Sequence, residues 1–302
     1  MKVFIAGATG AIGHPLVCEL LDEGHEVFGM TRSEERAMQI AKLGATPVIA
    51  DALNESSVLG AVKLVQPEVV IEMLTSLPKI YTPQAMREAS ALNDRLRTEG
   101  GAHLQKAAEA ARCRRYMVQS TAFWYAPGPG LATEEDSFAC DASAAIAAGS
   151  RKYADIEKRV LQSDHLEGVA LRFGIFYGPG TWYAPDGNMA DQVRHNSYPI
   201  VGGGQGVWNF VHVKDAAKGI SLALHAKPGA YNLTGDDPIA LSQWLPAYAR
   251  WLGAPPPPLR TSEEELEING ADSVYYATQL RGASNAKAKR DLGFAPRTLE
   301  FL

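Results

Sequence analysis

The chain has 302 residues, of which 46% are hydrophobic and 21% charged, and its net charge is −5. This composition is that of an ordinary globular protein, and it gives no general electrostatic reason to bind nucleic acid or an anionic membrane. Cys18, Cys113 and Cys140 are odd in number and widely spaced, which argues against a disulfide framework or a metal site and favours the cytoplasm. We expect neither a signal peptide nor a membrane-spanning segment.

Strand and helix patterns then alternate along the chain. Short apolar runs predict buried strands at 2–6, 26–30, 46–50, 67–71, 115–119 and 169–173. Helical spacing predicts helices at 12–23, 33–43, from about 54, at 84–111 and at 150–163. This alternation implies right-handed crossovers and an α/β fold of the Rossmann type, with a doubly wound parallel sheet.

After residue 177 the alternation is lost. Residues 178–207 are rich in Gly, Pro, Trp and Tyr. We predict a dinucleotide-binding domain from 1–177 with 208–228, and a smaller C-terminal substrate lobe from 178–207 with 229–302.

A glycine-rich turn stands between the first strand and the first helix. Glycines are needed there because the turn requires positive φ and because phosphates must approach the backbone closely. The amides at the start of the helix then face the pyrophosphate. The residues expected at the coenzyme are Gly7, Thr9, Gly10, Ala11, Ile12 and Gly13.

The end of the second strand indicates which nicotinamide coenzyme is bound. Enzymes that use NAD usually place an acidic residue there, but this chain has Thr31 and Arg32, with Arg36 one helical turn on. The two arginines suit a 2′-phosphate, so NADP(H) is favoured over NAD(H). Asp51 and Ala52, after the third strand, are expected at the adenine; Asp51 alternatively caps a helix.

The order of these motifs resembles the extended short-chain dehydrogenase/reductase family, also called the NAD-dependent epimerase/dehydratase family. The resemblance covers nearly the whole chain. It rests on Gly7–Gly13, 51–53, 119–122 with Tyr125, 171–173, 177–180, 210–217, 231–233, 284–288 and 291–293.

The resemblance implies a substrate cleft between sheet and lobe and a catalytic Ser/Thr–Tyr–Lys set. In that set the tyrosine exchanges a proton with the substrate oxygen, and the lysine lowers the tyrosine pKa and binds the nicotinamide ribose. Thr121 matches the Ser/Thr position, although a threonine at a strand end also caps turns.

The Tyr-x-x-x-Lys pair is absent. Matching Glu157 to the family's glutamate places Tyr153 at the lysine position and Gly149 at the tyrosine position. Matching Lys152 instead places Ala148 at the tyrosine position, so neither register restores the pair.

We favour the first register because it turns the apolar stripe Ile156, Val160 and Leu161 toward the sheet. Tyr153 then lies near the nicotinamide ribose, as a hydroxyl donor or a spacer; the alternative is a packed helix aromatic. For the family's asparagine on the long helix, Asn93 and Arg97 compete.

Without the pair, oxidation of an unactivated alcohol is disfavoured, whereas reduction of an activated carbonyl is less demanding. We therefore predict an NAD(P)H-dependent ketoreductase, similar to the atypical aromatic-polyketide (angucyclinone) ketoreductases of antibiotic biosynthesis. Aromatic side chains are expected to line an apolar substrate pocket. They are Phe123, Trp124, Tyr177 and Trp182.

Two other functions remain open from the sequence. One is a nucleotide-sugar epimerase or dehydratase, against which the absent pair argues. The other is a non-catalytic protein that senses NADP. The expected partner is a small-molecule substrate, with no nucleic acid and no membrane. Members of the family often form homodimers, and the sequence leaves both a homodimer and a monomer open.

Overall fold

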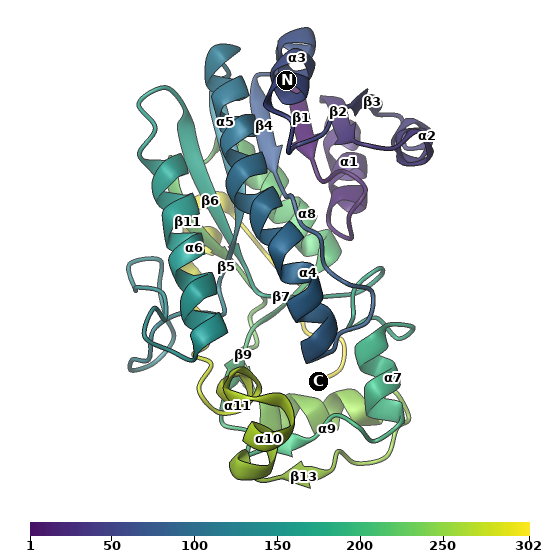
Figure 1. Cartoon of the computed structure of the whole chain (residues 1–302), viewed down its shortest axis with the longest axis vertical. Helices are drawn as coiled ribbons and strands as arrows, with labels where there is room; N and C mark the ends of the chain where they lie inside the picture. Colours follow the sequence, from purple (N-terminus) through teal and green to yellow (C-terminus); the bar gives the residue numbers. More distant parts are fainter.

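The computed structural model describes residues 1–302 and has a seven-stranded parallel sheet at its centre (Figure 1). The strand order is β3-β2-β1-β4-β5-β6-β11, with the order reversing beside β1 as in Rossmann folds. The strands are β1 (Lys2–Ala6), β2 (Glu26–Thr31), β3 (Thr46–Ile49), β4 (Val69–Glu72), β5 (Arg115–Thr121), β6 (Glu167–Phe173) and β11 (Gly229–Leu233).

Side chains alternate between the two faces of this sheet, and each face has its own core. Val3 and Ile5 of β1 point into one core, and Phe4 and Ala6 point into the other. The first core is shared with α1 (Gly13–Asp22), α2 (Glu34–Lys42), α8 (Val213–Leu222) and α12 (Ala286–Leu292). The second is shared with α3 (Glu55–Val65), α5 (Gly101–Ala110) and α6 (Ala144–Leu161). The predicted parallel sheet covered on both faces is thus confirmed.

The expected helix over 84–111 is interrupted. It consists of α4 (Pro83–Arg95), one π-helical turn η1 (Leu96–Gly100) and α5. Helix α4 has no buried residue and extends past the sheet toward the lobe (Figure 1).

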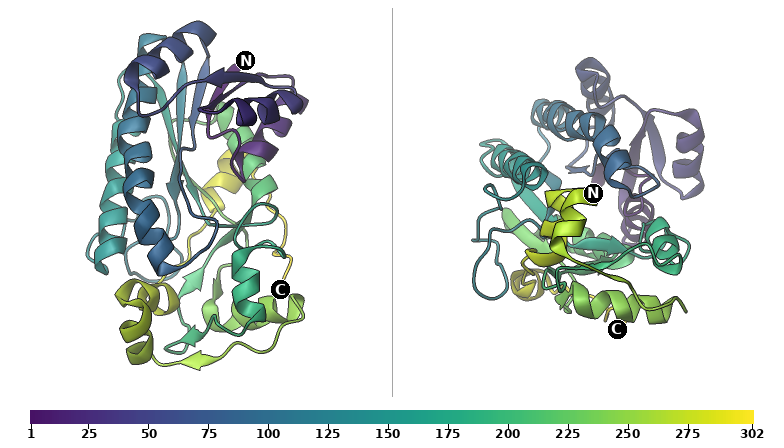
Figure 2. Two further views of the ribbon diagram at one scale, coloured as in Figure 1. Left: turned by 45° about the vertical axis from the view of Figure 1, so that its right-hand side comes forward. Right: turned by 60° about the horizontal axis from the view of Figure 1, so that its bottom comes forward.

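A smaller lobe lies beyond the carboxyl ends of the strands (Figure 2). Its helices are α7 (Asn188–Arg194), α9 (Leu241–Trp251), α10 (Ser262–Asn269) and α11 (Ala271–Thr278). Its short strands are β8 (Ile200–Val201), β9 (Val207–Trp208), β12 (Ile239–Ala240) and β13 (Leu259–Arg260). These elements enclose a third core, rich in aromatic rings.

Two connections join the lobe to the sheet. They are the strands β7 (Ile175–Tyr177) and β10 (Phe210–His212), which pair with each other in parallel. After β10 the chain continues into α8, which is followed by the short helix η2 (Ala223–His225). The predicted boundary at 229 is wrong, because β11 pairs in register with β6 and buries Tyr231 and Leu233 in the main core. Helix α12 also packs on β11, so the lobe does not include all of 229–302. No helix combines the length and apolar character needed to cross a lipid bilayer.

Candidate functional site

The glycine turn after β1 is tightly packed at Gly7 and Gly13 and open at Gly10. Gly7 has φ +108°, and a Cβ on it would lie 2.6 Å from the carbonyl oxygen of Met73. A Cβ on Gly13 would lie 2.2 Å from the Gly7 carbonyl oxygen, so both positions require glycine. Gly10 is exposed, and its Cβ would meet only that same carbonyl oxygen, at 3.4 Å.

The start of α1 offers unpaired donors beside this turn. The amides of Ala11 and Ile12 donate to no acceptor of the chain, and the N-cap Ile12 supplies no side-chain cap. The first turn of α1 contains no acidic residue either. This helix end therefore keeps its partial positive charge, which suits the diphosphate of a dinucleotide.

The residues expected at the adenosine half lie around the ends of β2 and β3. Thr31 is buried at the end of β2, whereas Arg32 and Arg36 are exposed and form no ion pair. Their guanidinium groups are thus free to meet a phosphate. Asp51 accepts the Leu53 amide at 3.0 Å, so this carboxylate also shapes its own turn.

The turn after β3 is shaped by the N-cap of α3 and by the packing of Ala52. Asn54, rather than Asp51, is the N-cap of α3, and it accepts the Ser57 amide. Ala52 is buried, and a Cβ on Gly100 would lie 3.1 Å from the Cβ of Ala52. The long helix therefore packs tightly against the turn after β3.

Thr121 ends β5 and is 1% exposed. The amide of Phe123 points at its hydroxyl oxygen at 3.4 Å. The hydroxyl therefore caps the turn after β5 and lies at the carboxyl edge of the sheet, where Rossmann folds bind their ligands.

Helix α6 carries Gly149 where the resemblance places the family's tyrosine. A Cβ on Gly149 would lie 2.4 Å from Cζ3 and 2.8 Å from Cη2 of Trp124. The Trp124 indole nitrogen donates to the Tyr276 hydroxyl at 3.0 Å, which holds the ring in place. An indole ring thus fills the space of the missing proton donor, and an indole offers no acidic proton near neutral pH.

Tyr153 follows one helical turn later and is half-buried. The centroid of its ring lies 5.8 Å from that of Trp124 and 5.1 Å from the guanidinium carbon of Arg97. Tyr153 therefore belongs to a stack that begins at the indole over Gly149 and ends at a buried arginine of η1.

The neighbouring Lys152 is held elsewhere, since its ammonium pairs with Asp94 of α4. Ile156 and Val160 are buried against the sheet, as the favoured register predicts. Leu161 is an exception, because it is exposed in the last turn of α6, and the apolar stripe is narrower than expected.

A buried polar network connects the strands near the carboxyl edge of the sheet with α6. The Arg172 guanidinium donates to the Glu157 carboxylate at 2.8 and 2.6 Å, and Ser120 donates to the same carboxylate. Arg172 also donates to the Tyr125 hydroxyl at 2.8 Å, which donates to Asn232 at 2.6 Å. Burial raises the Tyr125 pKa to about 12. The network joins β5, α6, β6 and β11. The sequence motifs include several of its members but do not predict that these side chains bond to one another.

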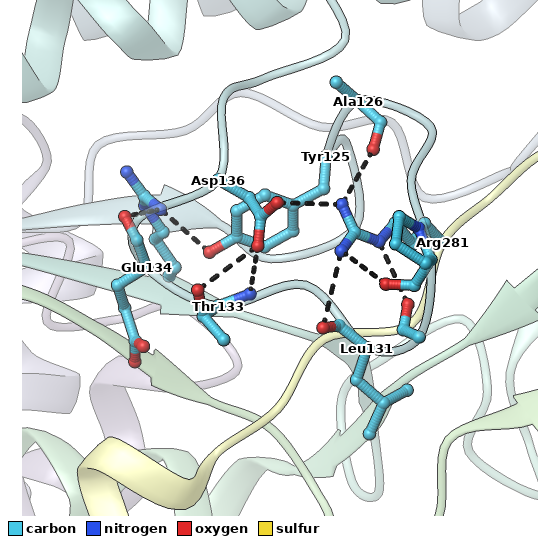
Figure 3. A network of polar contacts seen from close by, with 10 residues as sticks. Tyr125, Ala126, Leu131, Thr133, Glu134, Asp136 and Arg281 are labelled. Atoms are coloured by element: carbon cyan, nitrogen blue, oxygen red, sulfur yellow. Dashed lines mark hydrogen bonds and ion pairs between the residues drawn. The ribbon is translucent and has the colours of Figure 1, made fainter.

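The loop that follows Tyr125 is fastened to the C-terminal segment (Figure 3). Arg281 donates to Asp136 at 3.0 Å and to main-chain oxygens of 126–131. Asp136 accepts the Thr133 amide at 2.8 Å, and this contact together with Arg281 lowers the Asp136 pKa. The Glu134 carbonyl accepts from Arg172 at 3.1 Å, so the loop is continuous with the buried network.

Three of the four aromatic residues predicted for the substrate lie between sheet and lobe. The centroid of the Phe123 ring lies 5.3 Å from that of Trp124 and 6.4 Å from that of Tyr276. Trp182 lies 4.7 Å from Tyr81 by the same measure. All of these rings are partly exposed.

The fourth, Tyr177, is instead a core residue. It is 3% exposed and packs against Phe210, His212 and Phe301. Its position at the end of β7, which pairs with β10, turns the ring into the lobe core. Tyr177 is therefore packed in the core and is not partly exposed like the other three rings.

Four further tyrosines form a cluster that the sequence analysis does not predict. Tyr81, Tyr183, Tyr198 and Tyr276 come from separate segments, so no sequence spacing reveals the cluster. Burial raises the pKa of Tyr81 to about 12 and those of the other three further. They stay neutral hydroxyls at physiological pH and cannot act as bases.

Comparison with known proteins shows the family of this chain. The model of the "NAD dependent epimerase/dehydratase family" matches residues 3–234. The chain belongs to this family.

Its relatives include reductases. The chain is 42% identical to a "3-diazoavenalumate denitrifying reductase" of a Streptomyces species, over 98% of this chain and 96% of the relative. It is 26% identical to a ketoreductase of Stigmatella aurantiaca whose name gives a 3-oxo-dihydroquinoline-1-oxide substrate, over 81% and 71% of the two chains. The UDP-glucose 4-epimerase of Thermus thermophilus, solved with NAD, superposes with a TM-score of 0.73 at 21% identity, covering 99% and 95%. This last likeness concerns the fold alone.

The expected family and reductase activity are confirmed by these matches. The protein is a family member of the oxidoreductase type that uses a nicotinamide dinucleotide, and the glycine turn with its free amides fits that coenzyme. Within the family pattern, the departure lies in α6, where Gly149 and Tyr153 replace the tyrosine and lysine.

Proposed function

We propose that this family member binds NADPH and reduces an electrophilic group on a planar aromatic substrate, without a protonating side chain on α6. The observation that carries the proposal is the Trp124 ring over Gly149, which occupies the place of the proton donor. When bound, the coenzyme supplies a hydride. Thr121 and Tyr153 are the residues we assign to the reacting end of the substrate, and Phe123, Trp124 and Trp182 to its flat apolar faces.

The first candidate substrate is an aryl diazo compound, since the name of the Streptomyces relative gives a diazo substrate and a denitrifying reduction. In that reduction a hydride forms the new C–H bond, and the electron pair of the C–N bond leaves with N₂. The substrate is reduced, the coenzyme is oxidised, and no proton is added to the substrate. A site that lacks a Tyr–Lys pair loses nothing in such a reaction, which is why this class is favoured.

The second candidate is an aromatic ketone, the class named for the Stigmatella relative. A ketone takes up a hydride at carbon and a proton at oxygen. Water supplies that proton, and the hydroxyl of the half-buried Tyr153 donates a hydrogen bond to the reacting oxygen.

The choice of NADPH is supported by Arg32 and Arg36. Both are exposed, neither forms an ion pair, and no acidic side chain stands at the end of β2 to hold a 2′-hydroxyl. We also place the enzyme in the cytoplasm, which its three free thiols support.

The test uses the whole chain with NADPH deuterated at C4, a hydroxyaryl diazonium salt and the matching aryl ketone. We expect one N₂ released per coenzyme oxidised and deuterium at the ring carbon that carried the diazo group. Conversion of the ketone alone would support the second candidate, and conversion of neither would refute the proposal. Gly10→Asp is the control for spontaneous reduction, because this exposed position tolerates a side chain while the added carboxylate repels the pyrophosphate.

A further inference from the structure

The π-helical turn η1 places an arginine in an unusual position. Arg97 lies within Leu96–Gly100, where the long helix contains its only π turn, and single π turns inside α-helices recur at functional sites. The residue is 7% exposed, and its guanidinium lies over the ring of Tyr153 on α6. The arginine thus lies beside the α6 position where the resemblance places the family's lysine.

The charge of Arg97 has no counter-ion. No carboxylate lies within ion-pair distance, its side chain makes no hydrogen bond, and its Nε is wholly buried without a partner. Asp94, three residues earlier in the chain, pairs instead with Lys152 of α6. A buried guanidinium without an anion is strongly unfavourable, so an unpaired one beside residues assigned to the reacting end of the substrate indicates a ligand that completes it.

Other buried arginines of the chain do not share this state. Arg115 pairs with Glu167 at 2.7 Å, and Arg172 pairs with Glu157 at 2.6 Å. Arg97 is therefore not an instance of how this fold usually buries arginine. Of its three guanidinium nitrogens only Nε is sealed from solvent, so the two terminal nitrogens retain some exposure.

We infer that Arg97 is a catalytic residue that binds a substrate oxygen which is anionic, or becomes anionic as hydride arrives. The inference rests on the proposed function. In a ketone, hydride forms the C–H bond, the π pair of the carbonyl moves to oxygen, and water then protonates the alkoxide. In a hydroxyaryl diazo compound, which is neutral as the quinone diazide, the hydride leaves its negative charge on the ring oxygen as N₂ departs. A fixed cation beside that oxygen stabilises either product-like state.

The first test is Arg97→Met, which keeps a similar length and removes the charge. We expect kcat to fall about 100- to 1,000-fold, the range for loss of one oxyanion donor, while the Kd for NADPH changes little. We also expect a higher Tm than that of the wild type, because the substitution removes a buried unpaired charge. Arg95→Met is the matched control, since Arg95 lies two residues earlier, is exposed and pairs only with Glu99; it should leave kcat unchanged.

A second test does not depend on turnover. Bound 4-nitrophenol reports its own ionisation by its absorption, and with the oxidised coenzyme present we expect the wild type to bind it as the phenolate with a lowered apparent pKa. Arg97→Met should lose this shift and bind at least tenfold more weakly. If the wild type reduces neither candidate substrate yet shows the shift, the proposed function fails and the role of Arg97 stands.

Three results would overturn the inference. Unchanged kcat and phenolate binding in Arg97→Met would show that the cation meets no substrate oxygen. A loss confined to the Kd for NADPH would assign Arg97 to the coenzyme ribose instead. A lower Tm with unchanged phenolate binding would make it a packing residue.

Discussion

Adding one methyl group at Gly149 tests whether Trp124 truly occupies the place of the missing tyrosine. In an open helix Gly→Ala stabilises by about 1 kcal/mol through helix propensity. Here the added Cβ would lie 2.4 Å from the Trp124 ring, and overpacking of this kind costs about 2 kcal/mol. We therefore expect Gly149→Ala to lower the free energy of unfolding by about 1 kcal/mol, the difference between these two contributions.

The chain offers a matched control and a way to reverse the sign. A Cβ on Gly60, in the exposed middle of α3, would meet nothing within 4 Å, so Gly60→Ala should stabilise by about 1 kcal/mol. Trp124→Leu removes the two ring atoms that collide, and in that background Gly149→Ala should also stabilise. Urea unfolding of the four variants of this cycle should give a coupling energy of about 2 kcal/mol.

The reasoning would be refuted by one simple result. If Gly149→Ala stabilised the wild-type chain as much as Gly60→Ala does, the indole would not occupy that space. The Trp124 ring would then not explain why α6 lacks a proton donor. The proposal of a reaction that needs no proton donor would lose its main support.

Three further predictions concern separate parts of the molecule. Replacing Arg32 and Arg36 by Ser should raise the KM for NADPH at least tenfold, about 1.4 kcal/mol, and leave that for NADH nearly unchanged in steady-state assays. Glu157→Gln leaves the Arg172 charge buried without a carboxylate and should lower the free energy of unfolding by about 3–5 kcal/mol, measured in urea. Burial raises the Cys113 pKa to about 11, so at pH 8 a thiol reagent should modify the other two cysteines readily and Cys113 only after unfolding.

The sheet could be predicted because its information is local. A parallel strand buried on both faces is a short apolar run, and a glycine turn marks where the first helix begins. The strand Gly229–Leu233 is predicted in the lobe but belongs to the main sheet, because its place depends on a distant part of the chain. It pairs with β6, far earlier in the chain, and nothing in its own five residues reveals that partner.

The candidate site divides in the same way. The loop Gly7–Gly13 and Thr121 follow directly from strand ends, so the sequence places them. The indole over Gly149 could not be found, because it depends on how the loop after β5 packs against α6 and on a hydrogen bond to Tyr276 of the lobe. The burial of Arg97 depends on a π turn, for which helical spacing gives no signal.

These departures from the family pattern are coupled, and the coupling bears on how readily the usual chemistry returns. A tyrosine at Gly149 would collide with Trp124 from its Cβ onward, and moving that ring would break its hydrogen bond to Tyr276. A lysine at Tyr153 would bring a second cation beside Arg97, which already lacks an anion. Restoring either residue alone is therefore unfavourable, and restoring both requires changes in the β5 loop, in α6 and in η1 together. The indole, the tyrosine ring and the guanidinium pack as one stack, so a substitution in any one of the three elements changes the surroundings of the other two.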